Sequence, residues 1–237
     1  MIRGRSCVAA AFIVGSALAT VGAPQARAQD SARKQLLADV KQSMAANKQA
    51  LAQYTWQEQQ TISVKGEVKK QQMYSVQIGP DGKPQKTPMD QQASSGSPGG
   101  IKGKIVEKKK SEYEDYGKQI AALAQSYMQA DPAHLQQLYQ QGQITLAPGA
   151  SQLVIHNYVK QGDSVTMVFD TAAKAVKTID VSSYLSKPSD AVKISAQFQR
   201  IPDGPNHVSS MVVDGVSKQL TVQTQNSNYQ KLGSASS

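Results

Sequence analysis

Apolar residues recur with two different periods in the first part of the chain. Residues 31–53 repeat apolar side chains every three or four positions, which predicts an amphipathic helix with Ser31 as its N-cap. From Tyr54 the period changes to two, and this alternation covers residues 54–64 and 67–78. The Lys-Gly pair between the two runs favours a tight turn. We therefore predict a helix followed by a long antiparallel hairpin.

The middle of the chain combines turn-forming residues with helical periodicity. Residues 79–84 favour a turn, and residues 87–100 are rich in Gly, Ser and Pro, which predicts a mobile surface loop. Residues 101–129 carry an apolar stripe at three- and four-residue spacing, so we expect them to form the longest helix. A shorter helix should follow Asp131, with proline at its first position, and end near Gly142.

The rest of the chain alternates short apolar runs with turns. The connections, of which Asp214-Gly215 is the last, are too short for a crossover helix, so neighbouring strands must be antiparallel. The expected fold class is α+β: a large curved antiparallel sheet, a meander that can form a half-barrel, with an N-terminal helix and an inserted long helix covering one face. The strands predicted for this part are Gln152–Tyr158, Ser164–Asp170, Ala175–Ser182, Ala191–Gln199, His207–Val213 and Gln219–Thr224.

Residues 1–28 have the features of a secretory signal peptide. Arg3 and Arg5 form a positive start, residues 8–21 form an apolar run, and Ala26-Arg27-Ala28 is a small-x-small cleavage site. A membrane anchor is the alternative, but the run falls short of the ~20 apolar residues that span a bilayer. We therefore expect cleavage after Ala28, a single α+β domain over residues 29–237, and a periplasmic or secreted location.

Cysteine content and net charge limit the kinds of chemistry and of partner that the protein can have. The single cysteine, Cys7, lies in the predicted signal peptide, so the remaining domain has neither disulfides nor thiolate chemistry. The net charge of +9 suits simple solubility or an anionic partner of the cell envelope, and we expect no nucleic acid partner. The densest charge cluster, Lys108–Lys110, has acidic neighbours. That pattern is typical of a solvated helix face, with a patch for an anionic partner as the alternative.

Residue types that carry catalysis or bind metals form no recognisable group. None of the three histidines has a second ligand at metal-binding spacing, and neither a nucleophile elbow nor a phosphate-binding glycine loop occurs. Turn chemistry accounts for most of the aspartates. We therefore predict no enzyme, no catalytic or metal site and no cofactor. The residues concerned are His134, His156 and His207, and Asp81, Asp163, Asp203 and Asp214.

Two predicted strands are apolar on one face and mostly polar on the other. Such strands belong to a sheet with one covered side. The helices can fill that side as an ordinary core, or the sheet can curve away and leave an apolar groove for a ligand. Both interpretations stay open at this point. The candidate groove residues are Val165, Met167 and Phe169 on one strand and Val192, Ile194 and Phe198 on the other.

Four stretches of the chain resemble a family of uncharacterised exported bacterial proteins of the acidobacterial type. These are YTWQEQQTISVKGEVK, GPDGKPQKTP, GKIVEKKKSEYEDY and NSNYQKL. The order of elements also resembles the periplasmic lipoprotein carriers with the LolA/LolB-like half-barrel. The second resemblance implies that acyl chains are held in the concavity of an incomplete barrel, and it carries over no individual residue.

Three functional hypotheses follow. The first is a non-enzymatic periplasmic binding protein that holds a lipid or lipidated partner, such as a lipoprotein, in an apolar concavity. The second is an envelope scaffold or adaptor that binds another protein through Tyr54, Trp56 and Tyr74. The third is an unrecognised hydrolase whose acid–base groups lie far apart in the sequence. After signal cleavage, we expect no segment that spans a membrane.

Overall fold

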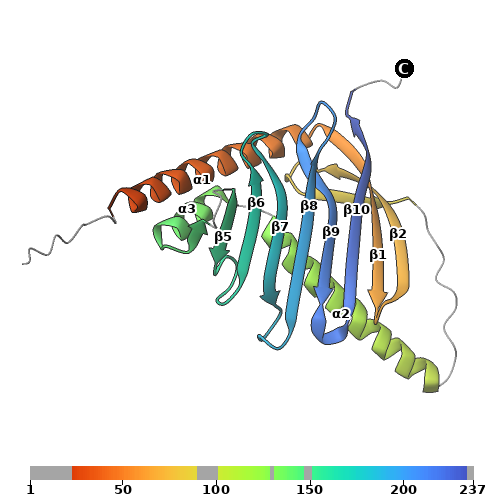
Figure 1. The fold of residues 1–237 in the computed structure, drawn as a ribbon. Coiled ribbons are helices and arrows are strands. Elements are labelled where there is room, and N and C mark those ends of the chain that lie inside the picture. The colour runs from red at the N-terminus through yellow and green to blue at the C-terminus, as the bar shows by residue number, and fades with distance from the viewer. Residues whose placement is uncertain (1–22, 90–100, 129–130, 147–150, 234–237) are drawn as a thin grey trace, which may run out of the picture.

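The computed structural model describes residues 23–89, 101–128, 131–146 and 151–233. An N-terminal helix precedes three strands, two further helices follow, and the rest of this part of the chain is a run of strands (Figure 1). The elements are α1 (Ala23–Leu51), β1 (Tyr54–Val64), β2 (Glu67–Ile78), β3 (Pro84–Pro88), α2 (Ile101–Met128), α3 (Pro132–Gln140), β4 (Ile144–Leu146), β5 (Gln152–His156), β6 (Ser164–Asp170), β7 (Ala175–Tyr184), β8 (Ala191–Arg200), β9 (Asn206–Gly215), the 3₁₀ turn η1 (Val216–Lys218) and β10 (Leu220–Lys231).

The strands form a single ten-stranded sheet in the order β3-β2-β1-β10-β9-β8-β7-β6-β5-β4. Every neighbouring pair is antiparallel. Strands β4 to β10 form a meander, and β10 then pairs with β1, the first strand of the chain. The structure thus confirms the predicted α+β class with an open, curved antiparallel sheet.

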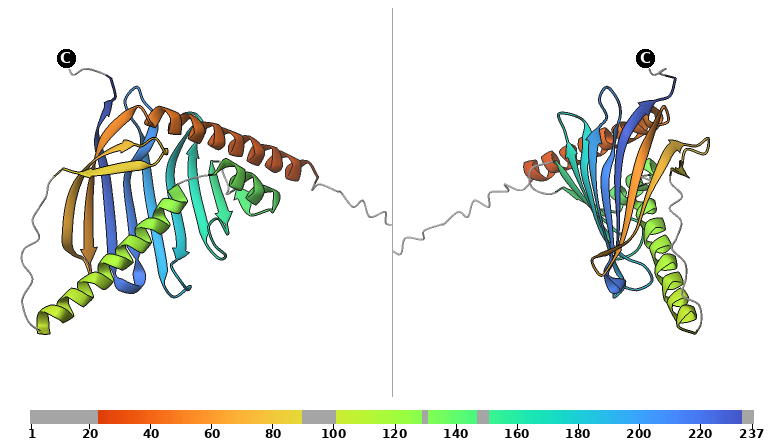
Figure 2. Two further views of the ribbon diagram at one scale, coloured as in Figure 1. Left: turned by 180° about the vertical axis from the view of Figure 1, so that it is seen from behind. Right: turned by 90° about the vertical axis from the view of Figure 1, so that its right-hand side faces the viewer.

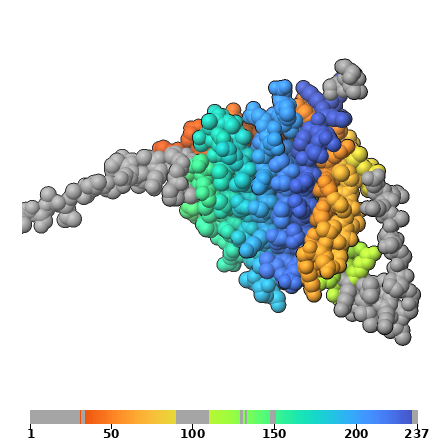
Figure 3. Space-filling view, turned by 45° about the vertical axis from the view of Figure 1, so that its right-hand side comes forward, coloured from red at the N-terminus to blue at the C-terminus, as the bar shows by residue number. Residues whose placement is uncertain are grey.

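All three helices lie on one face of the sheet, which we call the inner face (Figure 2). Because β3 and β4 form opposite edges of the sheet, the chain between them must cross that face, and α2 and α3 belong to this crossing. Helix α1 contacts β4, β7 and β9, whereas α2 contacts β9 and β10. On the other face, here the outer face, the strands run side by side with neither α1 nor α2 over them (Figure 3).

Residue chemistry explains most of the element boundaries. Lys65 and Gly66 both have positive φ angles, 54° and 81°, as a tight hairpin turn requires, and β1 and β2 have the predicted ends. Asp131 is the N-cap of α3, since its carboxylate accepts the backbone N–H of Ala133 at 2.8 Å. The six predicted C-terminal strands are all present; β6 has the predicted ends, and β10 continues to Lys231, well past the predicted end at Thr224.

Three expectations about boundaries were wrong. Helix α1 already includes residues from Ala23 onwards, so Ser31 lies inside it and is not its N-cap. Thr87 and Pro88 close strand β3 and do not belong to a loop. Asp214-Gly215 ends β9, and η1 makes the turn to β10. The short strand β4 was not predicted.

Two predicted segments fall largely outside the described residues. Residues 90–100 of the predicted mobile loop and residues 1–22 of the predicted signal peptide are outside them, while residues 23–28 belong to α1. Signal cleavage and export therefore stay predictions. Among the helices of the described residues, none combines the length and the apolar character needed to cross a membrane.

Candidate functional site: a groove between α2 and the β10-β1-β2 strands

The inner face of strands β4 to β9 is a closed hydrophobic core. Register places Val165 opposite Val181 and Ile194 opposite Val213, so apolar side chains face the helices strand after strand. Leu37 and Val40 of α1 and Ile120 of α2 cover them, and these are at most 4% exposed. This half of the sheet is a packed interior.

The six candidate groove residues all belong to this covered half. Five of them are at most 4% exposed, and Phe198 is partly buried against the same core. Of the described residues that line the groove presented below, none is among these six. Ligand contact by the six residues stays a prediction. The five buried residues are Val165, Met167, Phe169, Val192 and Ile194.

Tyr116 is one of the residues that hold helix α2 over the sheet. The Tyr116 hydroxyl donates to the Asp190 carboxylate at 3.1 Å and lies 3.1 Å from the Ser217 hydroxyl. Its ring packs on Gly215, where a Cβ atom would lie 2.4 Å from the ring. Only glycine allows this close approach of helix and strand. Tyr116 thereby fixes α2 against β9 and against the loops beside it.

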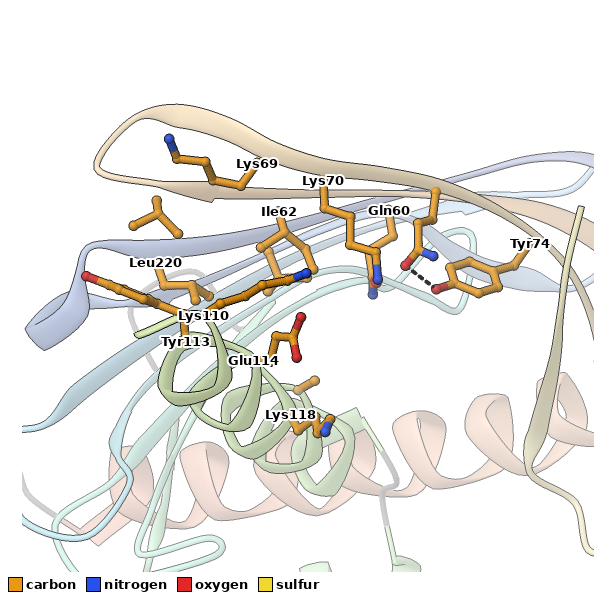
Figure 4. Close-up of a pocket in the computed structure, with 15 residues that line it drawn as sticks. Gln60, Ile62, Lys69, Lys70, Tyr74, Lys110, Tyr113, Glu114, Lys118 and Leu220 are labelled. Carbon is orange, nitrogen blue, oxygen red and sulfur yellow. Dashed lines mark hydrogen bonds between the residues drawn. The ribbon is translucent and has the colours of Figure 1, made fainter. Parts of the chain in front are cut away.

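Along one side of α2, from Lys110 to Ala121, the helix and the strands β10, β1 and β2 enclose an open groove of about 800 Å³ (Figure 4). Its volume lies within the range of sites for small ligands. The strands supply an apolar floor of Ile62, Val64, Leu220 and Val222. On the opposite side, Gly117 and Ala121 of α2 leave space between the helix and the strands, since neither carries a side chain larger than a methyl group.

Polar side chains occupy one end of the groove. Gln60 and Gln72 line it, and the Tyr74 hydroxyl donates to the Gln72 side-chain oxygen at 2.7 Å. Burial, and to a lesser extent the Glu58 carboxylate, raises the pKa of Tyr74, so its phenol stays protonated. Glu58 is itself buried and forms an ion pair with Lys86 of β3. This end of the groove therefore offers neutral hydrogen-bonding groups.

Lysines are the main charged groups of the groove. Lys69, Lys70, Lys110 and Lys118 line it together with one acid, Glu114. Lys69 pairs with Glu67, and Lys118 lies 3.5 Å from Asp115. Lys70 and Lys110 form no ion pair or hydrogen bond with any other residue that the structure describes. The groove therefore combines an apolar floor with an excess of positive charge.

Two of the three aromatic residues proposed for an adaptor surface are buried. Tyr54 is 8% exposed and Trp56 is 3% exposed, whereas Tyr74 lines the groove. The Trp56 ring packs against His207, with ring centroids 4.6 Å apart, and Tyr229 contacts both rings. Burial lowers the pKa of His207 to about 4, which keeps its ring neutral at physiological pH.

The most buried carboxylate serves the fold. Asp163, 2% exposed, accepts the backbone N–H groups of Tyr158, Val159 and Lys160 at 2.6–2.9 Å. It also accepts the Tyr127 hydroxyl at 2.6 Å. The burial of Tyr127, with the adjacent Asp163, raises the pKa of its phenol. Asp163 thus closes the β5–β6 loop as predicted for a turn residue, and it does so from inside the core.

The remaining histidines are His134 and His156. The His134 ring nitrogen Nε2 lies 2.7 Å from the Tyr158 carbonyl oxygen, and His156 is exposed at the end of β5. In the described part of the chain, no three His, Cys, Asp or Glu residues are placed to hold a metal ion.

Comparison with solved structures finds a likeness at low sequence identity. No protein-family model matches the chain, and neither does any curated protein. A crystal structure of a DUF1329 family protein from Desulfovibrio piger aligns with a TM-score of 0.45 and 13% identity, over 88% of this chain and 95% of that chain. Likeness at this level assigns neither a family nor a function. Both resemblances described above stay predictions.

The sequence did contain part of the signal for the groove. Ile62, Val64 and Tyr74 fall at inner-face positions of the predicted hairpin, and Tyr113 falls in the predicted stripe of α2. What the pattern lacks is the position of α2 relative to these strands. That position depends on the contact between Tyr116 and Gly215, which are far apart in the sequence.

Proposed function

We propose that this protein is a non-enzymatic carrier that works outside the cytoplasm and holds the acyl chain of a lipid or lipidated partner in the groove between α2 and strands β10, β1 and β2. The observation that supports this proposal most directly is the apolar floor of the groove of about 800 Å³, where Ile62 and Val64 are partly exposed beside the buried Leu220 and Val222. Burying an acyl chain there removes apolar area from water on both partners.

The shape of the groove suits a chain better than a compact ligand. Its floor follows neighbouring strands, and its opposite wall is one helix with small residues at Gly117 and Ala121. The groove is partly open, so a ligand can enter without unfolding any element that the structure describes. The burial of Tyr54 and Trp56 removes two of the three side chains that the adaptor alternative requires.

A binding titration with a matched pair of variants tests the proposal. Delipidated protein is titrated with a fluorescent fatty acid, and we expect saturable binding that unlabelled fatty acid displaces. Ile62→Asn places an amide on the floor and should weaken binding at least about tenfold. Thr61→Asn is the control, because the neighbouring residue of a strand points to the opposite face. Absence of saturable binding, or equal affinity in the two variants, would overturn the proposal.

A further inference from the structure

Positive charge enters the groove from both of its walls. Lys70 extends from β2, and Lys110 and Lys118 extend from α2 on the other side (Figure 4). Glu114 is the one acid among the described lining residues. Lys118 has Asp115 as a neighbour, whereas Lys70 and Lys110 have no charged or hydrogen-bonding partner among the described residues. Two uncompensated cations therefore lie beside the apolar floor.

This combination has a direct chemical counterpart. An ammonium group on a flexible four-carbon stem can lie along an apolar chain and keep its charge at the water boundary. An acyl chain with a neutral head group would leave both cations without a counter-charge. An acyl chain with an anionic head group would neutralise them at the edge of the groove, where the attraction is less screened than in bulk water.

We propose, building on the carrier function above, that the groove selects acyl ligands with an anionic head group. The chain lies on Ile62, Val64 and Val222, and the head group lies between Lys70 and Lys110. Glu114 limits the excess of positive charge between them, so Glu114→Gln should tighten binding of an anionic ligand a few-fold. The Gln60 amide and the Tyr74 hydroxyl, whose proton is donated to Gln72, complete the polar end of the groove.

The test compares two lysophospholipids with one acyl chain and different head groups. Lysophosphatidylglycerol is anionic and lysophosphatidylcholine is zwitterionic, and both are titrated below their micelle concentrations by calorimetry. We expect the anionic lipid to bind at least about tenfold tighter at low salt. The difference should shrink as ionic strength rises, because salt screens exposed charges.

Two double variants assign the selectivity to the groove. Lys70→Gln with Lys110→Gln should weaken binding of the anionic lipid several-fold more than binding of the zwitterionic lipid, and so remove most of the preference. Lys177→Gln with Lys193→Gln is the control, since these exposed lysines of β7 and β8 do not line the groove and the change in net charge is the same. This control should keep the preference of the wild type.

The outcomes separate the two proposals. Equal affinity for both lipids in the wild type, or the same loss of preference in both double variants, would overturn the inference about the head group and leave the carrier function standing. No saturable binding of either lipid or of the fatty acid would overturn the carrier function, and the inference with it.

Discussion

The strands in both halves of the inner face alternate inward-facing and outward-facing residues. Helices bury the inward-facing residues of one half and leave those of the other half partly exposed. On β8, Val192, Ile194 and Ala196 are at most 2% exposed, because helices cover them. On β1, Ile62 and Val64 occupy equivalent inner-face positions and remain partly exposed, because α2 stands off from that strand. Coverage by helices, together with the polar inner-face residues Gln60, Lys70 and Gln72, therefore distinguishes the candidate site from the core.

Removing a large side chain from the covered half should have the largest effect on stability. Phe169 is 1% exposed on β6, and Phe169→Ala should lower the free energy of unfolding by about 4 kcal/mol, because it leaves a cavity in a packed core. Urea denaturation measures the loss. Phe198→Ala, at a partly buried position of β8, should cost less.

The fatty acid affinity of the folded protein should be the same in both phenylalanine variants and in the wild type. If Phe169→Ala abolished binding and left stability unchanged, the ligand would occupy the covered half. The contrast between core and groove would then be wrong.

Acidification should weaken the cluster of Trp56, His207 and Tyr229. The pKa of His207 is about 4 in the folded protein and 6.5 for an unperturbed histidine, so the unfolded chain binds more protons between these values. Stability is therefore complete above pH 6.5 and falls as pH drops towards 4, by up to about 3 kcal/mol.

A variant isolates this contribution from that of the carboxylates. His207→Phe keeps an aromatic ring against Trp56 and cannot titrate. The difference in unfolding free energy between wild type and variant should change with pH between 6.5 and 4. A difference that is constant over this range would show that the two states of the protein bind protons equally at His207.

The contact that positions α2 can be tested with two glycines. Gly215→Ala places a Cβ atom 2.4 Å from the Tyr116 ring, so helix or strand must shift, and the free energy of unfolding should fall by about 1–3 kcal/mol. Gly117→Ala meets only Leu220 at 4.0 Å, and it should raise that free energy by up to ~1 kcal/mol, because alanine favours the helix. Thermal unfolding of both variants measures whether each substitution lowers or raises the free energy of unfolding. Equal effects would mean that Tyr116 does not anchor the helix.

The parts of the fold that could be predicted are those with a strong local signal. The change of period at Tyr54 and the Lys65-Gly66 turn give β1 and β2 their ends, and Asp131 with its proline neighbour starts α3. Strand β3 was missed because proline at both of its ends breaks the alternation, although proline is tolerated at a sheet edge. The start of α1 was missed because serine often caps a helix, whereas Ser31 lies inside this one.

The candidate site could not be predicted for a different reason. The predicted groove residues lie on the most apolar strands, β6 and β8, and these are strands that the helices cover. The groove lies where inner-face positions are mixed, with Gln60, Ile62 and Tyr74 in one lining. Its existence depends on contacts between distant segments, which no local period contains.

The most direct test of the central claim is to fill the groove from α2. Ala121 and Ala122 are both exposed on this helix, and of the two only Ala121 is among the described lining residues. Their side chains point about 100° apart around the helix. Ala121→Trp should lower the affinity for a fluorescent fatty acid at least about tenfold, with the melting temperature little changed. Ala122→Trp should bind as the wild type does. If both variants bound the fatty acid with wild-type affinity, or both lost it equally, the groove between α2 and the β10-β1-β2 strands would not be the binding site.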